Sequence, residues 1–187
     1  MAERVLVLGY GNPGRLDDGL GPALAAALEK DNLPGVTVDS DYQLTVEDAD
    51  SAARHDVVIF ADAALAGSEP FYFQRVQPRP EELGFSSHSL EPAGVLALAR
   101  KLFNAQPQGF ALGIRGYRFN EFGEELSPRA QANLEAALEF VRQALRTGRF
   151  EEVGYPPQAD QVDCDFVTKS AGSAPAPQPG LSKAGEK

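Results

Sequence analysis

The sequence contains one cysteine, no tryptophan and only two histidines among its 187 residues. The single cysteine, Cys164, excludes an intramolecular disulfide framework and any metal site built from several thiolates. No stretch approaches the run of about 18 apolar residues that a membrane-spanning helix needs. The N-terminal residues lead into a strand-like pattern without the profile of a signal peptide. We therefore expect a soluble, cytoplasmic protein with no membrane partner.

Positive charge is also scarce in this chain. Lys and Arg number 17 against 27 Asp and Glu, which gives a formal net charge of −10. Such a surface repels phosphate backbones, so nucleic acid is excluded as an expected partner. Hydrophobic residues make up 43% of the chain, which is enough to build the core of one ordinary domain.

The composition changes near residue 150 and again near residue 168. Residues 1–150 carry the regular apolar patterns and predict one α/β domain. Residues 151–167 are intermediate in composition and predict an extended strap against that domain. Residues 168–187 are rich in Pro, Ala, Ser and Gly. A segment of this kind buries too little apolar area to offset its ordering entropy, so we expect a disordered tail.

Within residues 1–150, apolar runs of strand length alternate with helical patterns. Runs that are apolar at every position suit strands covered on both faces, as in parallel sheets. The run at 71–76 (FYFQRV) suits an edge strand. A helical stripe over 128–146 begins at the N-cap candidate Ser127 and stops at Gly148. The predicted strands are 4–8, 36–38, 56–61, 71–76 and 110–114, and the predicted helices are 20–30, 89–103 and 128–146.

This alternation predicts a doubly wound α/β fold, with a mostly parallel five-stranded sheet and helices on both faces. Ligands of such sheets bind beyond the carboxyl ends of the strands. We therefore expect the functional residues within 9–18, 39–45, 61–66 and 84–90.

The first strand is followed by the loop Gly9-Tyr10-Gly11-Asn12-Pro13-Gly14, formally a G-x-G-x-x-G pattern. One interpretation is a dinucleotide-binding loop, and a protein that binds dinucleotides stays open as an alternative function. Pro13 removes an amide that a phosphate cradle would use. The acidic pair Asp17 and Asp18 then follows, where a pyrophosphate favours positive potential.

Three side chains with metal-ligand chemistry fall on the predicted functional edge. Asp18 precedes the first predicted helix, Asp62 follows the third predicted strand, and His88 precedes the next helix. Each has an ordinary structural interpretation as a cap, turn or loop residue. Together, two carboxylates and one imidazole form a ligand set that suits divalent nickel or zinc and leaves coordination positions open.

Four segments of the chain resemble the hydrogenase maturation endopeptidases. These segments are VLVLGYGNPGRLDDGLGP, VVIFADAA, SSHSLEPAGVLALA and LGIRGYRF followed by GEELSP, and they span roughly residues 4–147 in order. The resemblance implies an endopeptidase that removes the C-terminal extension of a nickel–iron hydrogenase large-subunit precursor after nickel insertion. The family's nickel-binding positions correspond to Asp18, Asp62 and His88.

The same resemblance implies that nickel arrives with the precursor and that no organic cofactor is needed. Asp18 stands where many family members have Glu. After the second strand this chain reads Asp41-Tyr42-Gln43-Leu44-Thr45, where many members have an Asp-Gly-Gly-Thr-like segment. The family resemblance implies that this loop, through Tyr42, Gln43 and Leu44, recognises the substrate. Its Gln-Leu variant resembles the family branch that serves soluble NAD-linked hydrogenases.

Two questions about the chemistry stay open from the sequence. Nickel could polarise the scissile carbonyl or acidify a bound water, or Asp18 or Asp62 could act as a general base. A non-catalytic nickel chaperone that uses the same three ligands is a further alternative.

Overall fold

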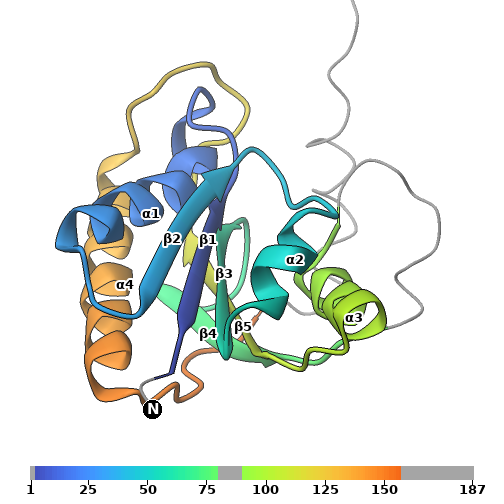
Figure 1. The fold of residues 1–187 in the computed structure, drawn as a ribbon. Coiled ribbons are helices and arrows are strands. Elements are labelled where there is room, and N and C mark those ends of the chain that lie inside the picture. The colour runs from blue at the N-terminus through green and yellow to red at the C-terminus, as the bar shows by residue number, and fades with distance from the viewer. Residues whose placement is uncertain (1–2, 80–89, 157–187) are drawn as a thin grey trace, which may run out of the picture.

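The structure, a computed structural model, describes residues 3–79 and 90–156 of the chain. They form a five-stranded sheet with helices on both faces (Figure 1), which confirms the predicted fold class. The strands are β1 (Val5–Tyr10), β2 (Val36–Asp41), β3 (Val57–Ala64), β4 (Phe71–Val76) and β5 (Gln108–Arg115). The helices are the 3₁₀-helix η1 (Leu16–Gly19), α1 (Leu20–Asp31), α2 (Asp48–Ala53), α3 (Pro92–Phe103) and α4 (Pro128–Thr147).

The strand order is β2-β1-β3-β5-β4, so β3 lies at the centre and β2 and β4 lie at the edges. The pairs β1–β2, β1–β3 and β3–β5 are parallel, and β4 runs antiparallel to β5. The prediction that residues 71–76 form an edge strand is therefore confirmed. The central position of β3 explains its continuous apolar run, because both of its faces are covered.

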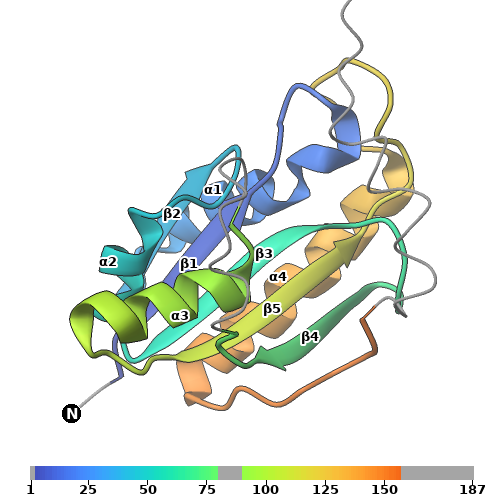
Figure 2. The same ribbon diagram turned by 90° about the vertical axis from the view of Figure 1, so that its right-hand side faces the viewer.

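Successive strand residues point to opposite faces and build two separate cores. On one face, residues such as Val7 and Ile59 pack with α1 and α4. On the other face, Leu8 and Phe60 pack with residues of α2 and α3. Figure 2 shows the two layers, with α2 and α3 in front of the sheet and α1 and α4 behind it.

The capping residues predicted for α4 are confirmed. The Ser127 hydroxyl accepts a hydrogen bond from the Ala130 N–H at 3.4 Å, and Pro128 occupies the first turn. At the other end Gly148 takes a φ of 65°, and its N–H donates to the Ala144 carbonyl at 2.8 Å. Helix α2 has no counterpart in the prediction, because six residues are too few to show a helical period.

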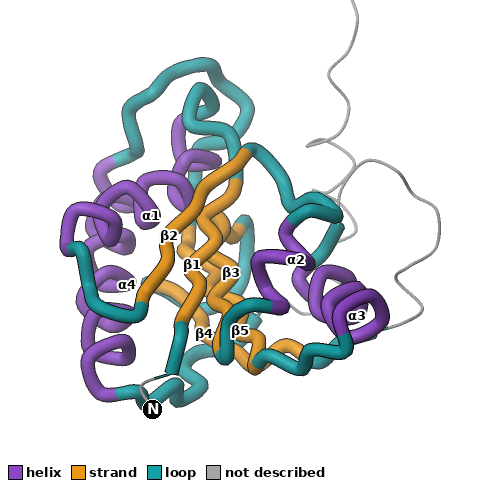
Figure 3. The backbone as a smooth tube through the Cα atoms, viewed as in Figure 1, coloured by secondary structure: helices purple, strands orange, loops and turns teal. Residues whose placement is uncertain are grey.

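The outer edge of β4 is covered by the chain that follows α4. The Phe73 N–H donates to the Val153 carbonyl at 2.7 Å, and the Val153 N–H donates back to the Phe73 carbonyl at 2.9 Å. Figure 3 draws this segment as a loop, and Figure 2 shows it running beside β4. Residues 157–187 lie outside the described part, so the far part of the strap, the tail and the domain boundaries stay predictions.

A search of the helices in residues 3–79 and 90–156 finds none with the length and apolar character needed to cross a bilayer.

Candidate functional site

The loop after β1 turns at Gly11 and brings Asp18 back against the end of that strand. Gly11 has a φ of 136°, and a Cβ there would lie 2.1 Å from the Asp18 carbonyl oxygen, so glycine is required. The Asn12 N–H donates to Asp18 Oδ2 at 3.2 Å, and the Gly14 N–H donates to Asn12 Oδ1 at 2.9 Å. These contacts hold the half-buried Asp18 carboxylate at the carboxyl edge of the sheet.

The same hydrogen bonds disfavour a dinucleotide cradle in this loop. The N–H groups of Asn12 and Gly14, which would face phosphate oxygens, already donate to side chains within the loop. The chain then enters the short helix η1, whose first turn contains Asp17 and Asp18 and no basic residue. A helix N-terminus normally offers positive potential to a pyrophosphate, but the two carboxylates make this one negative.

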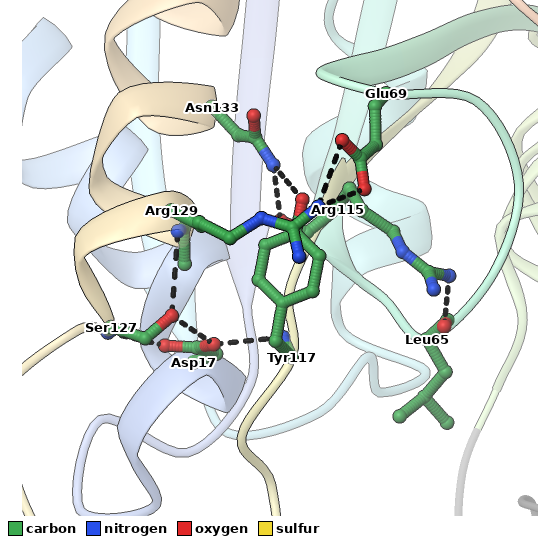
Figure 4. A network of polar contacts seen from close by, with 9 residues as sticks. Asp17, Leu65, Glu69, Arg115, Tyr117, Ser127, Arg129 and Asn133 are labelled. Carbon is green, nitrogen blue, oxygen red and sulfur yellow. Dashed lines mark hydrogen bonds and ion pairs between the residues drawn. The ribbon is translucent and has the colours of Figure 1, made fainter.

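Asp17 is fully buried, and its carboxylate joins η1 to the segment before α4 (Figure 4). It accepts hydrogen bonds from the N–H groups of Tyr117, Arg118 and Ser127 at 2.7–2.9 Å, and from the Ser127 hydroxyl at 2.8 Å. Burial alone would raise the pKa of Asp17, but these bonds favour the charged form and lower the pKa below its usual value. The sequence analysis did not single out Asp17, because two adjacent acids do not reveal which one points inward.

Asp62 lies on β3 itself, since that strand continues to Ala64 rather than ending at residue 61. Asp62 Oδ1 accepts from the Ala63 N–H at 2.7 Å. The same oxygen lies 3.5 Å from the position that a Cβ of Gly11 would occupy. Asp18 and Asp62 therefore both border Gly11, and the structure brings the two predicted carboxylates to one edge of the sheet.

Two tyrosines that the sequence analysis missed lie beside Asp62. Burial and the nearby Asp62 charge raise the pKa of Tyr72 to about 12. Burial first, and then the charge of Asp62, also raise the pKa of Tyr10 well above its usual value. Both phenols therefore stay neutral at physiological pH. Tyr10 stands within the loop motif and Tyr72 alternates with phenylalanines in FYFQRV, but neither pattern reveals a shared neighbour.

His88, the third predicted ligand, lies outside the described residues. The chain re-enters the described part at Leu90, whose N–H donates to the Leu44 carbonyl at 3.3 Å in the loop after β2. In that loop Tyr42 is 66% exposed and Gln43 is exposed, whereas Leu44 is buried in the core next to α2 and α3. The Leu44 side chain thus serves packing, and only the first two present their side chains to solvent.

Two of the three predicted metal ligands, Asp18 and Asp62, lie in the part of the chain that the structure describes. Within residues 3–79 and 90–156, no three His, Cys, Asp or Glu side chains could together hold a metal ion. The second histidine, His55, lies before β3 at the opposite edge, with ring nitrogens 2.7 Å from the Ser51 carbonyl and 2.9 Å from Thr37 Oγ1. Two carboxylates are ligands that suit a divalent cation whose other positions are filled by a second molecule.

A network of arginines beside the site fixes the ends of β5 and α4 (Figure 4). The Arg129 guanidinium lies 4.0 Å from the centre of the Tyr117 ring and 2.9 Å from a carboxylate oxygen of Glu69. Asn133 donates to the Tyr117 hydroxyl and to the Arg115 carbonyl, both at 2.9 Å. Because these cations already contact rings, carbonyls and a carboxylate, we assign them a structural role.

Comparison with solved structures identifies relatives of this fold. The hydrogenase maturating endopeptidase HybD from E. coli is 26% identical and matches 81% of this chain and 97% of its own, with a TM-score of 0.60. A hydrogenase 2 maturation peptidase from a Thaumarchaeota archaeon is 27% identical over 77% of this chain and 99% of its own, with a TM-score of 0.58.

A [NiFe] hydrogenase maturation protease, HycI from Thermococcus kodakarensis, shares the fold at 22% identity, with a TM-score of 0.62 over 77% of this chain and 93% of its own. No protein-family model matches the chain, and no curated protein matches it in sequence. The resemblance expected from the sequence motifs is therefore confirmed by structural similarity to hydrogenase maturation proteases.

Proposed function

We propose that this chain is an endopeptidase that removes the C-terminal extension of a nickel–iron hydrogenase large-subunit precursor after nickel insertion. The observation that carries the proposal is the meeting of Asp18 and Asp62 at Gly11. It occurs in a fold that matches 81% of this chain to a hydrogenase maturating endopeptidase. The nickel belongs to the precursor and is thus part of the substrate.

In this proposal Asp18, Asp62 and His88 ligate the precursor's nickel through its vacant positions. Carboxylate and imidazole donors suit nickel, and the described part supplies two of the three. A precursor without nickel lacks these contacts, so its scissile bond is not held over the edge of the sheet. Cleavage is thereby conditional on nickel insertion.

Hydrolysis adds water to the scissile carbonyl carbon and then breaks the C–N bond, with a proton passing to the leaving nitrogen. The water is activated either by the precursor's nickel as a Lewis acid or by Asp18 or Asp62 as a general base. Replacement of either aspartate by Asn keeps an oxygen donor but removes the group that can accept a proton.

Tyr42 and Gln43 form the proposed recognition surface for the precursor. Their side chains are exposed in the loop after β2, which adjoins the end of the strand next to β1. Leu44 anchors this loop through its buried side chain and through the hydrogen bond that its carbonyl accepts from Leu90. A fixed loop with two exposed side chains can select a partner without taking part in the chemistry.

The test is incubation of the purified protein with nickel-loaded and nickel-free precursor, followed by mass spectrometry of the precursor's C-terminus. We expect shortening only of the nickel-loaded precursor. Shortening of neither form, with nickel retained on the protein, would instead support a nickel chaperone. Equal shortening of both forms would contradict the role proposed for nickel.

Variants locate the activity on the proposed residues. Asp18→Asn, Asp62→Asn and His88→Ala should each abolish shortening while the protein keeps its melting temperature. Asp50→Asn, an exposed aspartate of α2 that pairs with Arg54, is the matched control and should leave shortening unchanged. Full cleavage by all three site variants would contradict the assignment of Asp18, Asp62 and His88 to the active site.

A further inference from the structure

One row of residues crosses the sheet at the level of Asp62. Asp62 pairs with Gly113 of β5, and Gly113 pairs with Tyr72 of β4. Directly opposite residues on paired strands point to the same face. Asp62, Gly113 and Tyr72 therefore share the face that α2 and α3 cover, with Gly113 in the middle.

Gly113 leaves the space into which the Tyr72 side chain extends. A Cβ built on Gly113 would lie 2.1 Å from Tyr72 Cε1 and 2.6 Å from its hydroxyl oxygen. The phenol thus lies flat across β5 and its hydroxyl stands above Gly113. Neighbouring strands are about 4.8 Å apart, so this hydroxyl is one strand spacing or less from the strand that bears Asp62.

Tyr10 occupies the corresponding place on the other side of Asp62. Gly9 of β1 pairs with Ala61 of β3, and one residue further along both strands Tyr10 stands beside Asp62. Tyr10 packs partly against the core on the α2 and α3 face. The Asp62 side chain is therefore bordered by one phenol on each side, and its charge raises the pKa of both.

We propose that Tyr72 is a positioning residue for Asp62, whose phenol lies over Gly113 and donates a hydrogen bond that aims the carboxylate at the precursor's nickel. The inference rests on the function proposed above. Groups that hydrogen-bond a ligating carboxylate fix its orientation, and their loss typically lowers metal affinity or activity about 10- to 100-fold. Gly113 is required for this arrangement, because any larger residue there would displace the Tyr72 phenol.

The primary test is Tyr72→Phe, which removes one hydroxyl and keeps the ring. We expect kcat/KM for nickel-loaded precursor to fall about 10- to 100-fold, and the affinity of the isolated protein for Ni²⁺, measured by calorimetry, to fall by a similar factor. Gly113→Ala retains the hydroxyl but displaces it, and should lower both quantities in the same direction. Tyr155→Phe, at a site that is 80% exposed, is the matched control and should change neither.

A double-mutant cycle separates positioning from a general structural effect. If Tyr72 acts through Asp62, adding Tyr72→Phe to Asp62→Asn should change Ni²⁺ affinity by less than about twofold beyond Asp62→Asn alone. Losses that add in full, or a Tyr72→Phe protein with unchanged Ni²⁺ affinity and kcat/KM, would overturn the inference. A wild-type protein that binds Ni²⁺ but leaves the precursor intact would refute the proposed function, and the Ni²⁺ titrations would then decide the role of Tyr72 by themselves.

Discussion

At the scale of single residues, Asp17 and Asp18 show how two adjacent carboxylates take different roles. Asp17 turns inward and accepts four hydrogen bonds that join η1 to the chain before α4. Asp18 turns toward the end of β1, where its carboxylate accepts a hydrogen bond from the Asn12 N–H at 3.2 Å. Asp17 thus anchors η1, the short helix that also carries Asp18.

Replacement of Asp17 should be costly for stability. Asp17→Ala leaves the N–H groups of Tyr117, Arg118 and Ser127 without their acceptor in a buried place, and each such loss costs about 1–3 kcal/mol. We expect the free energy of unfolding, measured by urea denaturation, to fall by about 3–5 kcal/mol. Asp18→Ala is the control and should cost less than about 1 kcal/mol. A near-wild-type Asp17→Ala protein would contradict the structural role.

The lowered pKa of Asp17 also predicts a pH dependence of stability. Its folded pKa lies below the unfolded value of about 3.9, so its contribution is complete above that pH and is lost as the pH falls through the folded pKa. Unfolding of wild type and Asp17→Asn should therefore differ most near pH 6 and converge toward pH 3. Exposed acids with lowered pKa, such as Asp31 and Glu69, are present in both proteins and cancel in the difference. A constant difference over this range would contradict the assignment.

At the scale of elements, the sequence predicted every strand and three of the four α-helices found in residues 3–79 and 90–156. The apolar runs located the strands, and Ser127 and Gly148 marked the ends of α4. Helix α2 escaped because its six residues hold only two buried alanines, and because its start is fixed by Asp48, whose carboxylate accepts from the Thr45 N–H at 2.6 Å. A contact of that kind becomes visible only once the loop has folded.

The loop between β2 and α2 is the element that we expect to select the precursor. Tyr42→Ala removes an exposed aromatic side chain without touching the buried Leu44 anchor, so the fold should persist. We expect KM for nickel-loaded precursor to rise about 10-fold with kcat nearly unchanged, because the lost contact is equally strong in the ground and transition states. Tyr155→Ala, at a site that is even more exposed than Tyr42 but lies on the strap side of β4, should leave KM unchanged. A fall in kcat alone would place Tyr42 in the chemistry instead.

At the scale of the whole molecule, the site is assembled by sheet order and register. Asp18 and Asp62 were singled out because they stand near the predicted carboxyl ends of β1 and β3, and parallel strands end at one edge. It could not reveal Tyr72, since β4 follows β3 in the chain but lies two strands away, beyond β5. The position of Gly113 in the sequence likewise could not reveal that its missing side chain leaves the space that the Tyr72 ring fills. Such residues are defined by neighbours on other strands, which no local pattern encodes.

The segment after α4 completes the sheet at its β4 edge. Beyond the paired bonds between Phe73 and Val153, the Gln74 side chain donates to the Gly154 carbonyl at 2.7 Å and the Ser68 N–H donates to the Tyr155 carbonyl at 3.0 Å. An uncovered edge strand is a template for pairing with another chain. These contacts lie in residues 151–156, the part of the predicted strap that the structure describes, and we predict that the folded unit extends at least that far.

Two truncations test this boundary. A protein ending at residue 156 retains every contact just described, so we expect the melting temperature and oligomeric state of the full chain. A protein ending at residue 150 loses the four hydrogen bonds just described and two more, from the Arg75 N–H to Glu152 and from the Tyr155 N–H to the Ser68 hydroxyl. At about 0.5–1.5 kcal/mol each, their loss should lower the free energy of unfolding by about 3 kcal/mol or more. Its exposed β4 edge should also promote self-association, seen by light scattering after size-exclusion chromatography. Equal stability and an equal oligomeric state of the two truncations would contradict a contribution of the segment after α4 to the sheet. Loss of folding in the shorter protein alone would show that residues 151–156 belong to the domain.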